Sequence, residues 1–172
     1  MTRAQLVTGG NRHSIPRILV TTVILLQAAC LQSPIPEPCR RSLDAQLSGW
    51  RLATVRKDVS DWANQAGLNP VLAAGDFDGD RRNDQAILVE HEAKRKVAVC
   101  FSTAEGTNVV MIDHPYCRDY ISTSKAGELH ENLDTQKPEV LGHDGISVAC
   151  FEQAGATYVY EGDAFREIVD SD

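Results

Sequence analysis

The sequence predicts a single α+β domain, built mostly from antiparallel sheet with one or two short helices. Residues 85–90, 96–101 and 108–112 are apolar runs of strand length. The connections between them are too short to hold a crossover helix, so neighbouring runs are expected to pair as antiparallel hairpins. An amphipathic segment over residues 58–67 precedes them. The chain of 172 residues is long enough for one such domain with a sizeable core.

The N-terminal segment has the layout of a secretory signal peptide. A basic stretch precedes a short apolar run, and small residues follow that run. The run is too short for a comfortable transmembrane helix. The parts in chain order are Arg3, Arg12 and Arg17, the apolar residues 18–26, and then Ala28 and Ala29. We therefore expect residues 1–29 to be a signal peptide.

Residues 26–30 read Leu-Gln-Ala-Ala-Cys and resemble the lipobox of bacterial lipoproteins, whose cysteine becomes the lipidated first residue. Gln27 departs from the Leu that this family prefers. The resemblance implies lipidation of Cys30 and a periplasmic or membrane-anchored protein. Ordinary cleavage nearby, which would give a secreted protein, is the alternative. Residues 30–40 are rich in Pro, which favours an extended tether, and one globular domain is expected over residues 41–172.

The cysteine count agrees with export. The chain has five cysteines, and lipidation of Cys30 would leave an even number for two disulfides in an oxidising compartment. The candidates are Cys39, Cys100, Cys117 and Cys150, for which three pairings are possible. The alternative is that Cys100 and Cys150, which lie in apolar runs, are small buried hydrophobes.

Helical patterns occur before the first long strand. Residues 42–47 are expected to form one or two turns that Gly49 ends. Residues 58–67 are the clearest helix, with Asp58 expected to cap its start and Gly67 to end it. Its apolar residues recur at helical spacing and share one face. They are Val59, Trp62, Ala63 and Ala66.

The remaining segments alternate between strands and turns. Residues 50–55 are expected as a strand, and residues 113–137 as a long irregular stretch with one possible helical turn at Leu129 and Leu133. The histidines and cysteine around this stretch lack the spacing of a zinc site. The C-terminal strands are expected over residues 146–152, 157–160 and 165–169.

A tight acidic loop lies between the helix and the first long strand. Asp76, Asp78, Asp80 and Asp84 fall within nine residues, and their carboxylates repel one another unless a cation neutralises them. Oxygen ligands at alternate positions of such a loop suit Ca²⁺. The spacing predicts that the four aspartates bind one structural Ca²⁺, with the Arg82 carbonyl as a further ligand. The alternative is an ion-free turn in which the aspartates accept hydrogen bonds from backbone amides.

Residues 76–84, Asp-Phe-Asp-Gly-Asp-Arg-Arg-Asn-Asp, resemble the calcium loop of FG-GAP and VCBS repeats. Arg81 stands where these repeats usually have a Gly that adopts a left-handed backbone. Such repeats build β-propellers from several copies, and because this chain has one loop a propeller is not expected. The tail over residues 144–172 is similar to the end of a group of small exported bacterial proteins without an established activity.

Charge narrows the choice of function. The net charge is −7, and removal of the three N-terminal arginines makes it −10, which disfavours nucleic acid and anionic membrane surfaces. The expected function is that of a non-enzymatic envelope lipoprotein that binds a protein partner as an adaptor or inhibitor and touches the membrane only through its lipid. The alternative is a metal-dependent hydrolase that uses Asp76, Asp78 and Asp84.

Export makes a direct prediction about the mature N-terminus. Mass spectrometry of the protein from the cell envelope should find a chain that begins at or near Cys30, with lipid mass on that cysteine. An N-terminus at Met1 would contradict export. A processed chain without lipid would contradict only the lipid anchor.

Overall fold

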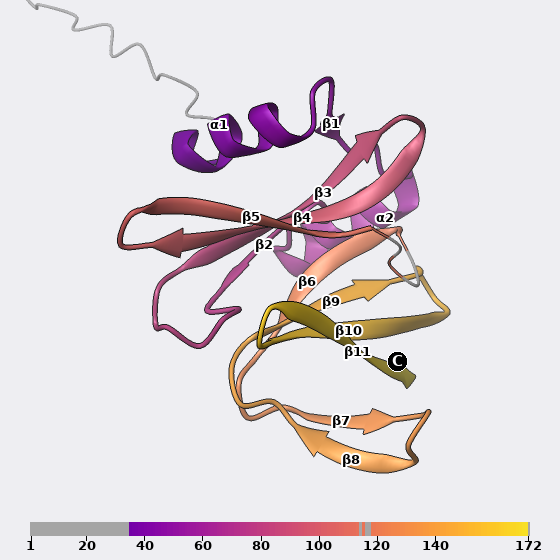
Figure 1. Cartoon of the computed structure of the whole chain (residues 1–172). Helices are drawn as coiled ribbons and strands as arrows, with labels where there is room; N and C mark the ends of the chain where they lie inside the picture. The colour runs from indigo at the N-terminus through magenta and orange to yellow at the C-terminus, as the bar shows by residue number, and fades with distance from the viewer. Residues whose placement is uncertain (1–34, 114, 116–117, 172) are drawn as a thin grey trace, which may run out of the picture. The chain divides into compact units, whose positions relative to one another are not determined.

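A computed structural model describes residues 35–113, 115 and 118–171 of the chain (Figure 1). The described part is a single small domain of antiparallel sheets with two helices, and it is neither a closed barrel nor a propeller. No helix in this part is long and apolar enough to span a membrane. In chain order its elements are α1 (Glu37–Gln46), β1 (Arg51–Leu52), α2 (Lys57–Ala66), β2 (Leu72–Gly75), β3 (Asp84–His91), β4 (Lys94–Thr103), β5 (Gly106–Ile112), β6 (Tyr120–Ser124), β7 (Leu129–Asn132), β8 (Lys137–Val140), β9 (Gly145–Ala149), β10 (Ala154–Glu161) and β11 (Ala164–Ser171).

The first sheet is formed by β1 to β5, with β3, β4 and β5 joined as consecutive antiparallel hairpins. Both faces of this sheet are covered, because α1 packs on one face and the second sheet on the other. Ile87 and Val89 point to the side of α1, whereas Ala86 and Leu88 point to the second sheet. Burial on both faces explains why this stretch is continuously apolar instead of alternating.

The second sheet has the order β11-β10-β9-β6, and the β7–β8 hairpin lies beyond it. Figure 1 shows the layers in turn: α1, the first sheet, the second sheet and the hairpin. The main core lies between the two sheets, and a small cluster of Leu141, Val159 and Ile168 lies on the other face of the second sheet. The sheets also meet edge to edge, where the Ile121 N–H donates to the Pro70 carbonyl and the Thr123 hydroxyl to the Ala74 carbonyl.

Helix α2 confirms the expected helix over residues 58–67, and Gly67 ends it with a left-handed φ of 70°. The expected cap is wrong. Arg56 is the residue at the N-cap, and Asp58 lies in the first turn, where it pairs with Arg56 at 3.0 Å. Val59 and Ala63 are buried. Trp62 is half-buried and packs against the rings of Tyr120 and Phe151, which lie in or beside the second sheet.

The prediction that residues 113–137 are largely irregular is wrong, because they contain β6, β7 and the first residue of β8. Leu129 lies on β7 rather than on a helical turn and is cross-strand partner to Val140. Both side chains are about two-thirds exposed, at 64% and 65%. The hairpin therefore lacks the one-sided apolar pattern by which strands are recognised in a sequence.

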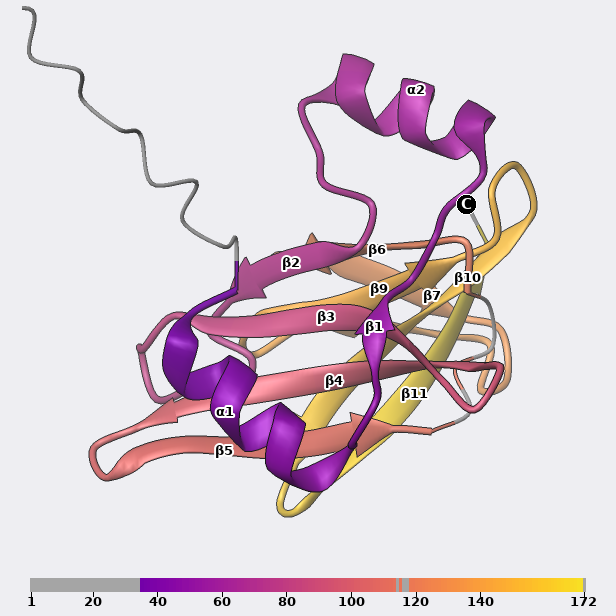
Figure 2. The same cartoon turned by 90° about the horizontal axis from the view of Figure 1, so that it is seen from above.

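Helix α1 begins at Glu37, four residues before the start expected for the globular domain at residue 41. Pro36 and Pro38 fit this start, since the first turn of a helix needs no backbone donor from them. Cys39 is buried in the helix and forms a disulfide with Cys100 of β4. Figure 2 shows α1 lying across the first sheet, to which this bond attaches it.

One of the expected disulfides is thereby confirmed. Cys150 is disulfide-bonded as well, while Cys117 lies outside the described residues. The Cys39–Cys100 bond spans 61 residues, and closing a loop of that length in the unfolded chain is worth about 4 kcal/mol in the entropic model.

The Cys39–Cys100 disulfide predicts a specific loss of stability. Replacing both cysteines with Ser should lower the free energy of unfolding by about 2–4 kcal/mol, because α1 loses its covalent link to β4. Urea unfolding of the variant and the wild type measures the difference. Free-thiol counting on the exported wild type is the control, and reduced Cys39 and Cys100 would contradict the prediction.

Candidate metal centre

The acidic loop connects β2 to β3 and is held against the core by one aromatic side chain. Phe77 is only 1% exposed and belongs to the core between the sheets. Its N–H donates to a carboxylate oxygen of Asp84 at 3.0 Å. The other Asp84 oxygen accepts the N–H of Ser102 on β4 at 2.8 Å. The loop is therefore fixed both to the core and to the neighbouring strand.

Within the loop, aspartate side chains replace missing backbone partners. Asp78 accepts the N–H of Asp80 at 3.1 Å, and Asp80 accepts the N–H of Arg82 at 2.8 Å. Asp76 accepts the N–H of Arg81 at 3.0 Å. Arg81 has a left-handed φ of 69°, the backbone conformation for which the related repeats use Gly. The bonds at Asp78 and Asp80, each to the amide two residues on, are those of the Asx-turn alternative, and the bond at Asp76 closes the loop around them.

Asp76, Asp78 and Asp84 form a cluster that could hold a metal ion. Each offers a carboxylate oxygen, and these oxygens lie within 4.8 Å of one another. Asp84 is completely buried, and Oδ1 of Asp76 is buried without a hydrogen-bond partner among the described residues. No Lys, Arg or His in the described part of the chain forms an ion pair with any of the three.

The electrostatics of the cluster disfavour three bare negative charges. Burial raises the pKa of Asp84 to about 6, against the opposing hydrogen bonds from Ser102 and Phe77, and the nearby charge of Asp78 adds to the rise. Burial also raises the pKa of Asp78, with Asp80 and Asp76 contributing as like charges. A divalent cation between the carboxylates would remove this penalty. Three carboxylates without a thiolate or imidazole are hard oxygen ligands, which suit Ca²⁺ or Mg²⁺ rather than Zn²⁺.

Asp80 and the Arg82 carbonyl, the other two predicted ligands, are not members of the carboxylate cluster. The structure leaves Asp80 out of the cluster, because its carboxylate pairs with the Arg82 guanidinium at 3.0 Å. Ligation by the Arg82 carbonyl stays a prediction. The predicted lipidation site Cys30, the predicted signal peptide and most of the predicted tether lie outside the described residues.

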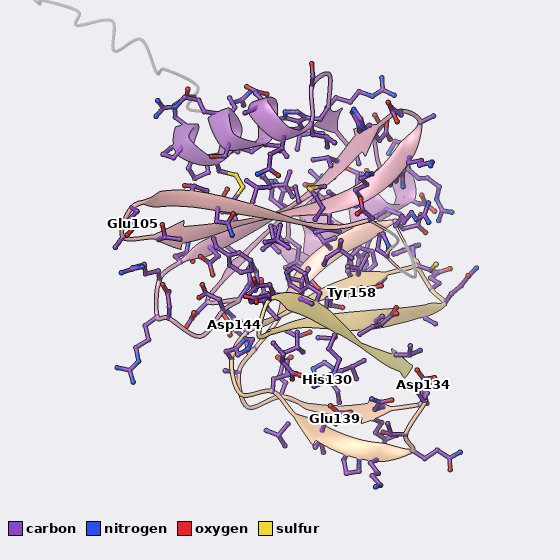
Figure 3. All side chains as sticks on the ribbon, in the orientation of Figure 1. Glu105, His130, Asp134, Glu139, Asp144 and Tyr158 are labelled. Atoms are coloured by element: carbon purple, nitrogen blue, oxygen red, sulfur yellow. A yellow bond between two sulfur atoms is a disulfide. The ribbon has the colours of Figure 1, made fainter. Side chains whose placement is uncertain are left out.

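The second sheet supplies support that the sequence did not reveal. Asp144, in the turn before β9 (Figure 3), accepts the N–H of Asp76 at 3.2 Å, and its own N–H donates to the Asp76 carbonyl at 3.1 Å. Lys125 and the Ala126 N–H also donate to the Asp144 carboxylate. Burial opposes the charge of Asp144, but these bonds outweigh it and lower its pKa. The glycine at position 75 makes this contact possible, because a Cβ there would lie 2.6 Å from an Asp144 oxygen.

His143 lies next to the loop but is already engaged. Its ring is 3.5 Å from where a Cβ on Gly79 would lie. Both ring nitrogens are near carbonyl oxygens, those of Asp144 at 3.0 Å and Tyr160 at 3.1 Å. The sequence indicated only a turn at residues 143–145. No local pattern shows that this turn contacts the acidic loop 68 residues earlier in the chain.

His130 is not part of the cluster. It lies on β7 as cross-strand partner of Glu139, with both side chains between the hairpin and the second sheet (Figure 3). The structure therefore gathers carboxylates alone at the acidic loop, and it gives no support to a zinc or Cys/His centre among the described residues.

Comparison with known proteins adds no relative: no family model, curated protein or solved structure matches the chain. The likeness of residues 76–84 to FG-GAP and VCBS loops therefore stays a resemblance.

The raised pKa of Asp84 predicts an unusual pH dependence in EDTA. Because burial raises the Asp84 pKa from its ordinary value of 3.8 to about 6 in the folded protein, the unfolded chain ionises first as the pH rises. The Asp84 contribution to the free energy of unfolding should then fall by about 2 kcal/mol between pH 4 and pH 6, out of about 3 kcal/mol over the whole titration. Urea unfolding of the wild type and of Asp84→Asn across this pH range measures the contribution of Asp84 as the difference between the two proteins. Parallel pH profiles for the two proteins would contradict the assignment.

Proposed function

We propose that the chain is a non-enzymatic protein of the bacterial cell envelope, exported, anchored by lipid at Cys30 and stabilised by one Ca²⁺ in the acidic loop. Its acidic domain binds another protein as an adaptor or inhibitor. The observation that carries the cation part is the carboxylate cluster of Asp76, Asp78 and Asp84, in which Asp84 is fully buried and no member forms an ion pair within the described residues.

Calcium fits this cluster better than the smaller Mg²⁺. Carboxylates that bind through one or both oxygens, together with water, can supply the six to eight oxygens that Ca²⁺ takes, whereas Mg²⁺ demands near-ideal octahedral geometry and gives up water reluctantly. Asp76 contributes a buried oxygen that no other described group satisfies. The ion would neutralise the three charges and fix the entry of β3. Its role is therefore structural.

The disulfides support export. Disulfides form and persist in oxidising compartments such as the periplasm and are rare in the cytosol. Cys39 also lies nine residues after Cys30, the position at which the lipobox resemblance places the lipid. A lipid there would hold α1 and the first sheet close to the membrane surface.

The hydrogen bonds of the cluster favour a structural role over a hydrolase. The donors to Asp76, Asp78 and Asp84 within the described residues are backbone amides, those of Arg81, Asp80, Phe77 and Ser102. General acid–base catalysis needs a side chain or water positioned to exchange a proton with the substrate. The nearby His143 faces two carbonyl oxygens instead. The metal-dependent hydrolase therefore has no specific observation in its favour.

Calcium binding predicts a shift in thermal unfolding. With an affinity of roughly 10⁻⁴–10⁻³ M, as in extracellular modules, Ca²⁺ at about 100 times the dissociation constant should stabilise the fold by about 2.7 kcal/mol over EDTA. Asp78→Ala should lose this shift, because it removes one of the three clustered carboxylates. Calorimetry in EDTA, Mg²⁺ and Ca²⁺ measures the effect.

Two further variants make the test specific. Asp134→Ala removes an exposed carboxylate from the β7–β8 turn and should keep the full Ca²⁺ shift. Arg81→Gly relieves a left-handed residue and removes a positive charge beside the loop, so it should raise Ca²⁺ affinity. If saturating Ca²⁺ leaves the wild-type midpoint where EDTA leaves it, the loop is an Asx-rich turn and the cation part of the proposal is wrong.

A further inference from the structure

Strand β5 forms an edge of the first sheet, and its outward backbone groups can be identified from the register. The Thr103–Gly106 pair closes a two-residue turn, so Gly106, Asn108, Val110 and Ile112 exchange hydrogen bonds with β4. The intervening residues Thr107, Val109 and Met111 therefore direct their N–H and C=O groups away from the sheet.

Only one of these outward groups has a partner in the described structure. The hydroxyl of Ser42 on α1 donates to the Thr107 carbonyl at 3.3 Å, which confirms that this carbonyl points outward. Neither Val109 nor Met111 has a hydrogen-bond partner on the outward side within the described residues. The two residues thus present an unpaired stretch of strand beside α1.

Four of the other outer strands carry the usual protections against strand addition. Edge strand β8 has Lys137 and Pro138, and β11 has charged residues and accepts the Leu133 N–H at Val169. Strands β2 and β6 cover one another through the bonds at Pro70 and Ala74. Strand β5 reads Gly-Thr-Asn-Val-Val-Met-Ile and has neither a charge nor a proline. An uncharged edge of this length readily pairs with another strand.

We propose that the chain forms a homodimer in which β5 pairs antiparallel with β5 of a second copy. Pairing Val109 with Met111 of the second copy, and Met111 with its Val109, satisfies the free backbone groups of both chains at once. Val110 then lies opposite Val110 of the second copy, on the two-fold axis. Apolar side chains meet on both faces and no like charges oppose one another, so the edge complements itself.

The geometry also suits a protein held at one membrane. The two-fold axis of an antiparallel strand pair is perpendicular to the sheet, so both α1 helices lie on the same face of the joined sheet. The two chains therefore enter their domains from one side, as two lipid anchors in the same membrane require. The paired stretch is short, so we expect a dimer that dissociates on dilution and that membrane anchoring favours.

Analytical ultracentrifugation of the full exported chain at increasing concentration tests the dimer. The wild type should approach twice the monomer mass. Met111→Pro, which deletes an outward N–H, and Asn108→Lys, which adds a charge at an exposed position of the same strand, should remain monomeric. The matched control is Glu167→Pro, which deletes an outward N–H from the other long edge strand, β11, and should still dimerise.

Circular dichroism shows whether each variant is folded, and Asn108→Lys keeps the test decisive if Met111→Pro fails to fold. A photo-crosslinking amino acid at Asn108 should join two copies in intact cells, and the same group at the exposed Asn64 of α2 should not. A wild type that stays monomeric at every concentration, together with no crosslink in cells, would overturn the proposal. Equal association of the wild type and both β5 variants would do the same.

Discussion

The buried carboxylate of Asp84 is the constraint around which the loop and the two sheets are arranged. An ionised group without contact with water is unfavourable unless other groups replace its hydration. Here the Phe77 and Ser102 amides replace part of it. Phe77 in turn fills the core between the sheets, so the group that solvates the charge also anchors the loop. A cation bound between the carboxylates would complete the compensation.

The acidic loop combines two arrangements that its sequence presents as alternatives. Backbone amides already bind one oxygen each of Asp76 and Asp78, as in an ion-free turn. The cluster nevertheless keeps a buried free oxygen on Asp76. The turn therefore preorganises ligands that a cation would join, and preorganisation reduces the ordering that binding requires. Asp144 extends the arrangement into the second sheet, which makes the loop a contact between the sheets as well as a turn.

The first sheet is organised by burial on both faces. One face meets the second sheet, and α1 covers the other, where Cys39 and Leu43 pack with Ile87 and Val109. The disulfide fixes this layer covalently to β4. Such a sheet is shielded from solvent on both faces, but the outward backbone groups of its edge strand, β5, are not covered by another strand. The unpaired groups of β5 follow from that arrangement, because α1 packs over the Val109 side chain but, within the described residues, hydrogen-bonds to the strand only at Thr107.

The sequence by itself determined the strong local features. The periodic helix α2, its end at Gly67 and the β3–β4–β5 hairpins follow from hydrophobic spacing and turn residues, which act within a few residues of one another. It also showed that Asp76, Asp78 and Asp84 belong to one loop, because they are close in the chain. Tertiary structure decided the features that depend on distant partners. Cys39 joins Cys100 across 61 residues, and β7 and β8 lack a buried stripe that would reveal them. The pairing of Asp80 with Arg82 is local, but the spacing of the aspartates does not distinguish it from ligation. Asp144 supports Asp76 from the turn before β9, and no local periodicity records a contact between segments so far apart.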